Sequence, residues 1–294
     1  MKFLNYGSVN IDLVFTVDHM VEPGETLSSS SFFRSAGGKG ANQSAALAKA
    51  GAQVSHAGKI GSDGQFLVDL LSGYGVDTSL IRLYEGATGQ ALIQLDKHKQ
   101  NAIVLYGGGN LQITKEEIDE SLALFGEGDM LLLQNEIVYT SYLIEQGKKR
   151  GMKVCLNTAP FDDTILDFPL HLIDILVVNE IEGAALAKTG KGATFTEVLD
   201  ALVEGYPESE IVLTVGKGGA YYGYKDVRLH EPIYDLPVAD TTAAGDTFIG
   251  YFLTSRSLGH DNQQALRYAC KASGLAVSRL GAMGSIPLAS EVFD

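Results

Sequence analysis

The stretch MLLLQNEIVYTSYLIEQGKKRGMKVCL, residues 130–156, decides the fold class of this chain. Its first four residues, Met130–Leu133, are all apolar, which is typical of a strand buried on both faces of a parallel sheet. The next segment, Tyr139–Arg150, predicts a helix that ends at Gly151, and Lys153–Leu156 predicts a second buried strand. A strand, a helix and a strand in this order form a βαβ unit, whose two strands lie parallel.

The same alternation continues toward the C-terminus. Apolar runs at Ile173–Val178 and Ile211–Val215 predict two more buried strands, and two long helical stretches follow at Ala244–Leu258 and Asn262–Leu280. This order predicts an α/β fold with a doubly wound, mostly parallel sheet and helices on both faces, that is, a three-layer α/β/α sandwich. Two further strands, Tyr221–Tyr224 and Val227–His230, predict a meander. Capping boxes predict the starts of three helices, at Thr114-x-x-Glu117, Asn179-x-x-Glu182 and Thr194-x-x-Glu197.

The N-terminal part carries shorter strands between glycine-rich turns. Lys2–Val9, Ile11–Val17 and Thr26–Phe33 predict three strands. A turn over residues 36–40 then opens a helix of small residues, which Gly51 ends.

Two later runs, Gln90–Leu95 and Asn101–Tyr106, have the pattern of a hairpin. Together with the early strands they predict a second, smaller β-sheet. We expect a single domain over residues 1–294, with this sheet built from two insertions at approximately 11–36 and 88–107.

Composition limits the possible functions. The 294 residues include 22 Lys and Arg against 36 Asp and Glu, a formal net charge of −14, and 45% of the residues are hydrophobic. The apolar content excludes disorder, and the acidic balance argues against nucleic acid and anionic membranes as partners. There is no signal-peptide pattern and no run of about 18 apolar residues. Cys155 and Cys270 lack metal-site spacing, so we expect reduced thiols and a cytoplasmic protein.

A nucleotide phosphate cannot be bound here by the common glycine motifs. None of the five Gly-Lys dipeptides is followed by Ser or Thr, so there is no P-loop. No GxGxxG follows the first strand, which argues against a second hypothesis, a nicotinamide-dependent dehydrogenase.

The segment DTTAAGDTF, residues 240–248, offers a different phosphate site. Small residues lead directly into an apolar helix. Unpaired N–H groups at a helix N-terminus attract anions, and Ala and Gly side chains let a phosphate approach them. Asp246 then lies beside the anion, where it can accept a proton from an attacking hydroxyl. The alternative is that Asp246 only complements the helix dipole.

This segment and GGKGANQ, residues 37–43, resemble the two signatures of the ribokinase family, also called the PfkB carbohydrate kinases. The resemblance covers almost the whole chain, because further blocks fit in order, and it implies a ribokinase-like sandwich with a β-sheet lid. These blocks are Gly7–Asp12, Pro23–Thr26, Thr88-Gly89, Gln134–Glu136, Asn179–Glu182, Thr214–Gly219 and Gly281–Pro287.

The resemblance implies roles for individual residues. Asp246 is the implied catalytic base, and Ala243, Ala244 and Gly245 form the implied anion hole. The implied sugar-binding residues are Asn10, Asp12, Gly38, Lys39, Asn42, Glu136 and Asp246. The implied ATP-binding residues are Asn179, Thr214, Gly216, Lys217, Gly219 and Gly245.

Metal positions are implied in the same way. Glu182 completes an NxxE pattern associated with Mg²⁺, although a plain capping box explains the same residues. The implied monovalent-cation site, for K⁺, consists of Asp240, Thr242, Ala276, Arg279, Gly281 and Ser285.

The implied activity is ATP-dependent phosphorylation of the primary hydroxyl of a small sugar. The segment 37–43 and Asn10-x-Asp12 favour D-ribose. The alternatives are a kinase for another furanose, a keto-sugar acid or a nucleoside, or a sugar-binding sensor without catalysis. A lid sheet too small to bury both of its faces also predicts a homodimer joined through lid strands.

Overall fold

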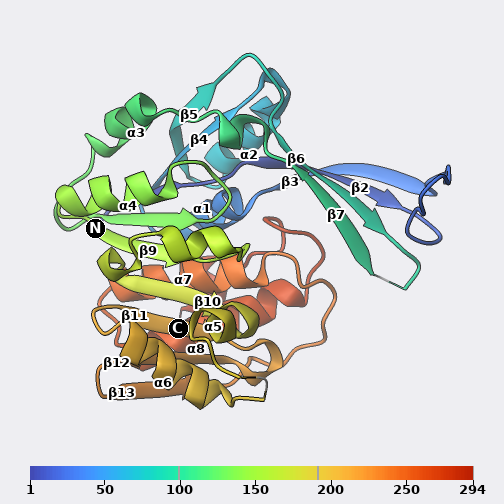
Figure 1. Ribbon diagram of the computed structural model, residues 1–294. Coiled ribbons are helices and arrows are strands. Elements are labelled where there is room, and N and C mark those ends of the chain that lie inside the picture. Colours follow the sequence, from blue (N-terminus) through green and yellow to red (C-terminus); the bar gives the residue numbers. More distant parts are fainter. Residues whose placement is uncertain (99, 191, 294) are drawn as a thin grey trace.

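The computed structural model describes residues 1–98, 100–190 and 192–293. Its larger sheet has nine strands in the order β13-β12-β11-β10-β9-β8-β1-β4-β5 (Figure 1). Neighbours from β11 to β5 are parallel, and β12 and β13 add an antiparallel edge. The strands are β1 (Phe3–Tyr6), β4 (Val54–Ile60), β5 (Asp77–Leu83), β8 (Met130–Gln134), β9 (Lys153–Asn157), β10 (Ile175–Asn179), β11 (Glu210–Thr214), β12 (Ala220–Tyr224) and β13 (Val227–Glu231).

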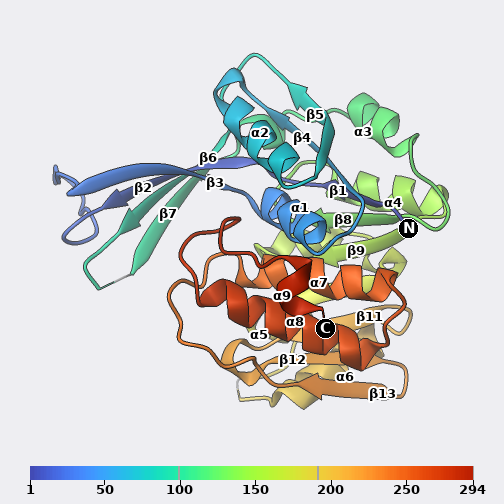
Figure 2. The same ribbon diagram turned by 180° about the vertical axis from the view of Figure 1, so that it is seen from behind.

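Helices cover both faces of this sheet, which confirms the three-layer prediction (Figures 1 and 2). One face packs against α1 (Lys39–Lys49), α2 (Gln65–Gly73), α7 (Ala244–Ser257), α8 (Asn262–Val277) and α9 (Ala289–Val292). The other face packs against α3 (Lys115–Leu122), α4 (Thr140–Lys149), α5 (Glu180–Leu186) and α6 (Phe195–Gly205).

Strand β8 shows why an apolar run was the deciding signal. Met130 and Leu132 face the core beneath α1 and α7, while Leu131 and Leu133 face the core beneath α3 and α4. Successive side chains of a strand point to opposite faces, so a strand between two helix layers needs apolar residues at every position. All three predicted capping boxes form at the starts of α3, α5 and α6.

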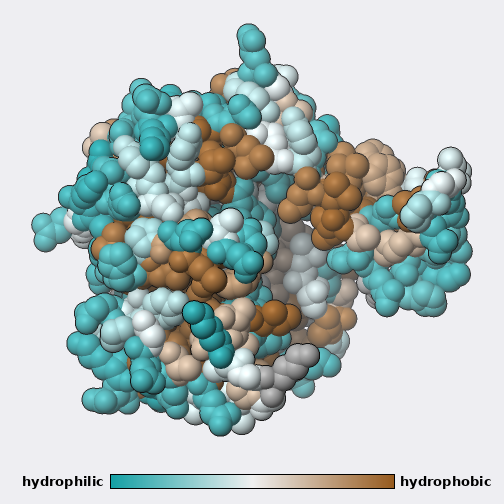
Figure 3. Space-filling model, in the orientation of Figure 1, coloured by the Kyte–Doolittle hydropathy of each residue, from teal (hydrophilic) through white to brown (hydrophobic). Residues whose placement is uncertain are grey.

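The smaller sheet, called the lid below, has the order β3-β2-β6-β7 and projects from the body (Figure 1). Its strands are β2 (Asn10–Thr16), β3 (Ser31–Gly37), β6 (Gly89–Leu95) and β7 (Asn101–Tyr106). They come from the two predicted insertions. In space-filling view a hollow separates the lid from the body, and hydrophobic surface gathers where the two meet (Figure 3).

Two sequence expectations for the strands need correction. The strand predicted at Thr26–Phe33 runs from Ser31 to Gly37, because β2 ends at Thr16, opposite Ser31, and earlier residues have no strand to pair with. The strands β4 and β5 had no expected counterpart. The sequence of β4, VSHAGKI, shows neither an apolar run nor strict alternation, yet most of it is buried.

Successive strands are added on opposite sides of β1: β4 and β5 lie on one side of it, and β8 and the later strands of this sheet lie on the other. Strand β1 pairs with β4 on one side and with β8 on the other, although β8 begins at Met130. Ligands of open α/β sheets bind outside the carboxyl ends of the strands at such a point. Among the described residues, no helix has both the length and the apolar character needed to cross a membrane.

Candidate active site

A pocket of about 200 Å³ opens at this carboxyl edge. It collects residues from the ends of β9, β10 and β11 and from the starts of α1, α5 and α7. Many of the predicted site residues meet here, namely Lys39, Asn179, Glu182, Thr214, Ala243, Ala244, Gly245 and Asp246. Segments that are far apart in the sequence therefore form one site.

The N-terminus of α7 has the form expected of an anion hole. Ala243 precedes the helix with a left-handed backbone, φ 59° and ψ 14°, and no side chain caps the helix. The first N–H groups of a helix have no partner within it, and here that turn lines the pocket. A methyl group and a hydrogen at Ala244 and Gly245 leave this backbone accessible to a phosphate.

Asp246 lies in the first turn of α7 and is 7% exposed. Each of its carboxylate oxygens accepts a hydrogen bond from a side-chain amide of α1. Asn42 donates from Nδ2 to Oδ2 at 3.0 Å, and Gln43 donates from Nε2 to Oδ1 at 2.9 Å. A buried carboxylate needs such donors to offset the loss of water. The contacts join the two signature segments.

Glu136 lies just beyond β8 and faces the start of α1. Its Oε2 accepts from the backbone N–H of Lys39 at 3.0 Å and from the Ser8 hydroxyl. Burial raises the pKa of Glu136, and the contacts with Ser8 and Lys39 partly oppose that rise.

Asp12, on β2, is the lid's contribution to the same region. Burial raises its pKa to about 6, and the nearby charge of Glu136 adds to the rise. Its carboxylate packs against Gly37, where any Cβ would collide with it. Asn10 begins the same strand, and its Oδ1 accepts from Asn110 Nδ2 at 2.7 Å.

Gly38 makes the turn from the lid into α1. Its φ is +93°, and a Cβ there would lie 2.9 Å from the carbonyl oxygen of Ser8. A larger residue would therefore be strained and would push α1 away from the strand end. Glycine at this position brings Lys39 and Asn42 close to the pocket.

The predicted nucleotide residues fall into two groups. Asn179 caps α5, and its Oδ1 accepts from the backbone N–H groups of Ile181 and Glu182, each at 2.9 Å. Glu182 Oε2 in turn accepts from the backbone N–H of Asn179 at 3.0 Å and from Thr158 Oγ1 at 3.0 Å. The capping-box alternative for Glu182 is thus confirmed, and the residue also lines the pocket.

Gly216, Lys217 and Gly219 form the second group and lie on the turn after β11. They are not among the residues that line the pocket, although Thr214 just before them is. Gly216 and Gly219 have positive φ values of 51° and 89°. This turn therefore lies at the same edge of the sheet, next to the pocket but outside it.

The two segments of the implied cation site lie together. Asp240 accepts from Thr242 N at 2.9 Å and from Gly281 N at 3.0 Å, which ties its own turn to the loop after α8. Burial acts to raise the pKa of Asp240, but the hydrogen bonds from Thr242 and Gly281 outweigh it and lower the pKa. Ser285 is buried and donates to Ala282 O at 2.7 Å, which leaves its oxygen lone pairs available.

The donor chemistry fits the two implied metals. Carbonyl and hydroxyl oxygens of the cation loops suit a hard monovalent ion. Ala276 lies at the end of α8 and Arg279 just after it, paired with Glu291. Over the described residues no group of three or more His, Cys, Asp or Glu could form a metal cage. Mg²⁺ does not require such a cage, since it keeps several waters and binds substrate phosphates.

Several residues of the site had no sequence-based prediction. Gln43 is the last residue of the GGKGANQ segment, and Ser8 lies two positions before Asn10, so both residues belong to segments that were already expected to contribute to the site. Polar residues at strand ends in an otherwise apolar run, as in MLLLQ, were the available signal for Gln134. Nothing local distinguishes Asn110, because its partner Asn10 lies 100 positions away.

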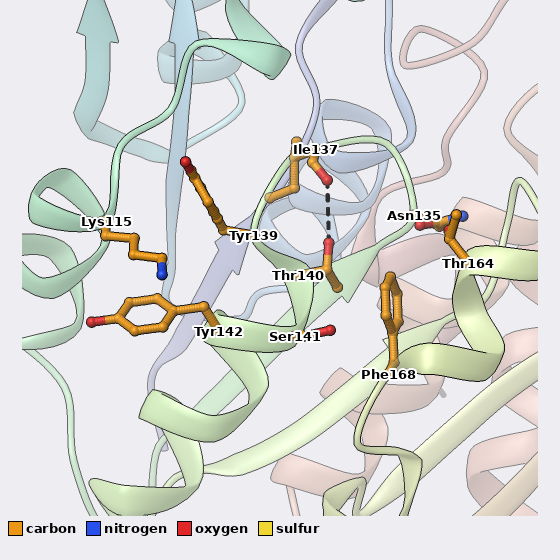
Figure 4. Close-up of a pocket in the computed structure, with 9 residues that line it drawn as sticks. All are labelled: Lys115, Asn135, Ile137, Tyr139, Thr140, Ser141, Tyr142, Thr164 and Phe168. Atoms are coloured by element: carbon orange, nitrogen blue, oxygen red, sulfur yellow. Dashed lines mark hydrogen bonds between the residues drawn. The ribbon is translucent and has the colours of Figure 1, made fainter.

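A larger cavity of about 420 Å³ lies beside the N-terminus of α4 (Figure 4). Lys115 lies over the rings of Tyr139 and Tyr142, and Thr140 donates to Ile137 O at 3.3 Å. Its nine lining residues include no carboxylate. No carboxylate is therefore available there to accept a proton, and the smaller pocket around Asp246 is the candidate reaction centre.

Comparisons with known proteins find ribokinases that match nearly the whole chain. The ribokinase of Staphylococcus aureus (strain COL) is 35% identical over 301 residues, which cover 99% of this chain and 98% of that protein. The crystal structure of ribokinase from Cryptococcus neoformans var. grubii serotype A in complex with ADP has a TM-score of 0.87 at 32% identity, with 99% and 98% coverage.

Arabidopsis thaliana ribokinase complexed with ribose and ATP has a TM-score of 0.88 at 29% identity, covering 99% of this chain and 97% of that one. The family described as pfkB family carbohydrate kinase matches residues 2–289. With that match over nearly its full length, this chain belongs to the PfkB family of carbohydrate kinases.

Proposed function

We propose that the protein transfers the γ-phosphoryl group of ATP to the primary hydroxyl of D-ribose, forming D-ribose 5-phosphate and ADP. The observation that carries the proposal is the buried carboxylate of Asp246 beside the uncapped N-terminus of α7, in one pocket with Lys39 and Asn179. Full-length similarity to ribokinases supports ribose as the acceptor.

The chemistry follows from the pocket. Asp246 accepts the proton of the sugar hydroxyl as its oxygen attacks the γ-phosphorus in line. A new O–P bond forms while the bond between the γ-phosphorus and the β–γ bridging oxygen breaks, and ADP leaves. The backbone of the anion hole, formed by Ala243, Ala244 and Gly245, stabilises the charge on the transferred group.

The sugar is held between the lid and α1. Asn10 and Asp12 approach from the lid, and Gly38, Lys39, Asn42 and Glu136 approach from the body. Carboxylates and amides pair with the hydroxyls of a polyol, and a site built this way rejects analogues that lack one.

ATP binds along the strand ends, with its phosphates toward α7. Asn179 and Thr214 contact the phosphate side, and Gly216, Lys217 and Gly219 lie on the turn that we assign to the rest of the nucleotide. Glu182 would help to position Mg²⁺ indirectly, and the ion would supply charge neutralisation for the phosphates.

A monovalent cation, K⁺, binds between the turn of Asp240 and Thr242 and the loop of Gly281 and Ser285. Carbonyl oxygens of Ala276 and Arg279 complete its ligands. When bound, such an ion would order the backbone immediately before Ala243, and thereby the anion hole.

The lid also serves as a dimer contact in our proposal. Phe33 is 51% exposed and Ile103 is 50% exposed, so apolar side chains of the lid face solvent in one chain. Strand register places Phe33 and Ile103 in one row with Val14 and Ile93. A second lid would cover them through a two-fold contact. We place the enzyme in the cytoplasm, which suits the free thiols of Cys155 and Cys270.

A coupled kinase assay tests the proposal. Purified protein is incubated with ATP and Mg²⁺ and with a panel of ribose, 2-deoxyribose, fructose, a keto-sugar acid and nucleosides. We expect the highest kcat/KM for ribose. Turnover of another sugar alone would reassign the substrate, and sugar binding without turnover would identify a sensor.

A further inference from the structure

We propose that Gln43 and Gln134 are positioning residues that hold the carboxylate of Asp246 in its reactive orientation. This inference rests on the proposed function, because it assumes that Asp246 is the base. Gln43 is 0% exposed and Gln134 is 1% exposed, and neither lines the pocket that holds Asp246. They act through another side chain.

Both amide hydrogens of Gln43 are used. Nε2 donates to Asp246 Oδ1 at 2.9 Å and to Asn157 Oδ1 at 3.3 Å. With Asn42 on the other oxygen, the plane of the carboxylate is held at two points. A base held this way presents a constant lone pair toward the position of the sugar hydroxyl.

An amide can rotate by half a turn and exchange its oxygen for its nitrogen, which would destroy this contact. Gln134 prevents the exchange, because its Nε2 donates to Gln43 Oε1 at 2.7 Å. If Gln43 turned over, its oxygen would face the carboxylate of Asp246 and its NH₂ would face the NH₂ of Gln134. Both encounters are unfavourable in a buried site.

The orientation of Gln134 is determined in turn by Asn5. Gln134 Nε2 also donates to Asn5 Oδ1 at 2.9 Å. Asn5 Nδ2 donates to the backbone carbonyl of Gly40 at 2.7 Å and to Ser44 Oγ at 2.8 Å. A backbone carbonyl can only accept, so Gly40 dictates which end of the Asn5 amide faces Gln134. The Gly40 carbonyl thus determines the orientation of the Asn5 amide. Through Asn5 it also determines the orientations of the Gln134 and Gln43 amides, and Gln43 contacts Asp246.

The contacts of Ser44, at the other end of this hydrogen-bond network, are consistent with the same orientation of the Asn5 amide. Ser44 Oγ lies 2.8 Å from Nδ1 of His56, which is 0% exposed. Burial lowers the pKa of His56 to about 4, and a contact with the Gly7 backbone partly opposes that change. The ring is therefore neutral at neutral pH, and in the tautomer with its hydrogen on Nε2 it accepts the Ser44 hydroxyl hydrogen through Nδ1.

The substitution Gln134→Glu tests whether Gln134 determines the orientation of the Gln43 amide. When the new carboxyl group is ionised it only accepts, so it would turn the Gln43 amide and direct its oxygen at Asp246. When the same group is protonated it can donate to Gln43 Oε1 and so preserve the native direction. Asp246 and His56 contact the network, and Glu136 interacts with Asp246 through its charge. These titratable groups are present in both proteins, so each measurement is expressed as variant over wild type.

We expect the kcat ratio of Gln134→Glu to wild type to fall by roughly tenfold or more as pH rises from about 6 to about 9. The KM for ribose and the Kd for ADP should stay within about threefold of wild type. Gln134→Met keeps the volume without the charge, and its kcat should be lowered by a factor that does not change with pH. Ser209→Ala, which removes a buried hydrogen bond to Ile173 O far from this network, is the stability control.

A kcat ratio of Gln134→Glu that is flat with pH, or a loss that Ser209→Ala reproduces at equal Tm, would overturn the inference. If Gln134→Glu does not fold, Gln43→Leu provides the test. We expect this variant to have a lower kcat at unchanged KM, and an unchanged kcat would contradict the inference. An active wild type with insensitive variants refutes only the positioning role. A wild type that binds ribose and ATP without turnover refutes the proposed function and this inference together.

Discussion

Asn42 on α1 donates a hydrogen bond from Nδ2 to Oδ2 of Asp246 on α7 at 3.0 Å, across 204 positions of sequence. This contact joins a residue that we assign to sugar binding with the residue that we assign to proton transfer. On that assignment, the same side-chain pair would place both the sugar hydroxyl and its base. Helices α1 and α7 pack on one another to bring this about: a Cβ at Gly250 of α7 would collide with Ala46 of α1.

The first prediction concerns Asp246→Asn. The amide has nearly the same shape but cannot accept the hydroxyl proton, so we expect kcat to fall by about 10²- to 10⁴-fold. Ribose affinity, measured by calorimetry, should change little. The control is Asp261→Asn, the same change at the start of α8, where the side chain only caps the helix by accepting from Gln264 N. Near-normal kcat in Asp246→Asn would refute the assignment.

The second prediction concerns stability at Asp12. Its pKa is raised from 3.8 to about 6, so the folded state holds a proton that the unfolded state has lost. The free energy of unfolding therefore falls as pH rises from about 4 to about 6. Asp12→Asn removes the buried charge and should stabilise the protein by roughly 2–3 kcal/mol at neutral pH, with no gain near pH 4.

Urea unfolding at pH 4.5 and pH 7.5 measures this difference. Asp63→Asn provides a control of opposite sign. Burial acts to raise the pKa of Asp63, but its hydrogen bonds with Thr88 outweigh that effect and lower the pKa. This variant should lose stability at pH 7.5. Equal effects of the two substitutions would show that Asp12 is not destabilised by burial.

The third prediction concerns the lid. Ile103→Glu places a charge in the apolar row of the lid, so we expect the homodimer to dissociate at micromolar concentration while the fold is kept. Light scattering measures the mass. Leu124→Glu is the matched control, because Leu124 is 64% exposed and lies outside the lid. A monomeric wild type would remove the dimer proposal and leave the kinase proposal intact.

The fourth prediction concerns the cation. We expect faster turnover in K⁺ than in Na⁺ or tetramethylammonium. Asp240→Ala releases the ties to Thr242 and Gly281 and should abolish the difference between the ions. Asp226→Ala, on the exposed turn between β12 and β13, should keep it. Equal wild-type rates in all three salts would contradict a monovalent-cation site.

The class of fold, which the structure confirms, and the neighbourhood of the candidate site were both predictable from local patterns in the amino-acid sequence. Apolar runs such as Met130–Leu133 can be satisfied only between two helix layers, and capping boxes such as Asn179-x-x-Glu182 act through neighbours three residues apart. The small residues before Asp246 likewise carry their information locally, since access to a helix N-terminus depends on side-chain size. Each of these signals lies within a few positions of the chain.

Tertiary structure decided which polar side chains meet, because their partners are distant in sequence. Gln134 reaches Gln43 across 91 positions, and Asn110 reaches Asn10 across 100. The burial of Asp12 and the neutral state of His56 also depend on what packs over them, so no local pattern foretold either. Strand β4 could not be predicted from the sequence for the same reason. Its polar residues His56 and Lys59 are buried because α1 and α3 supply hydrogen-bond partners for them.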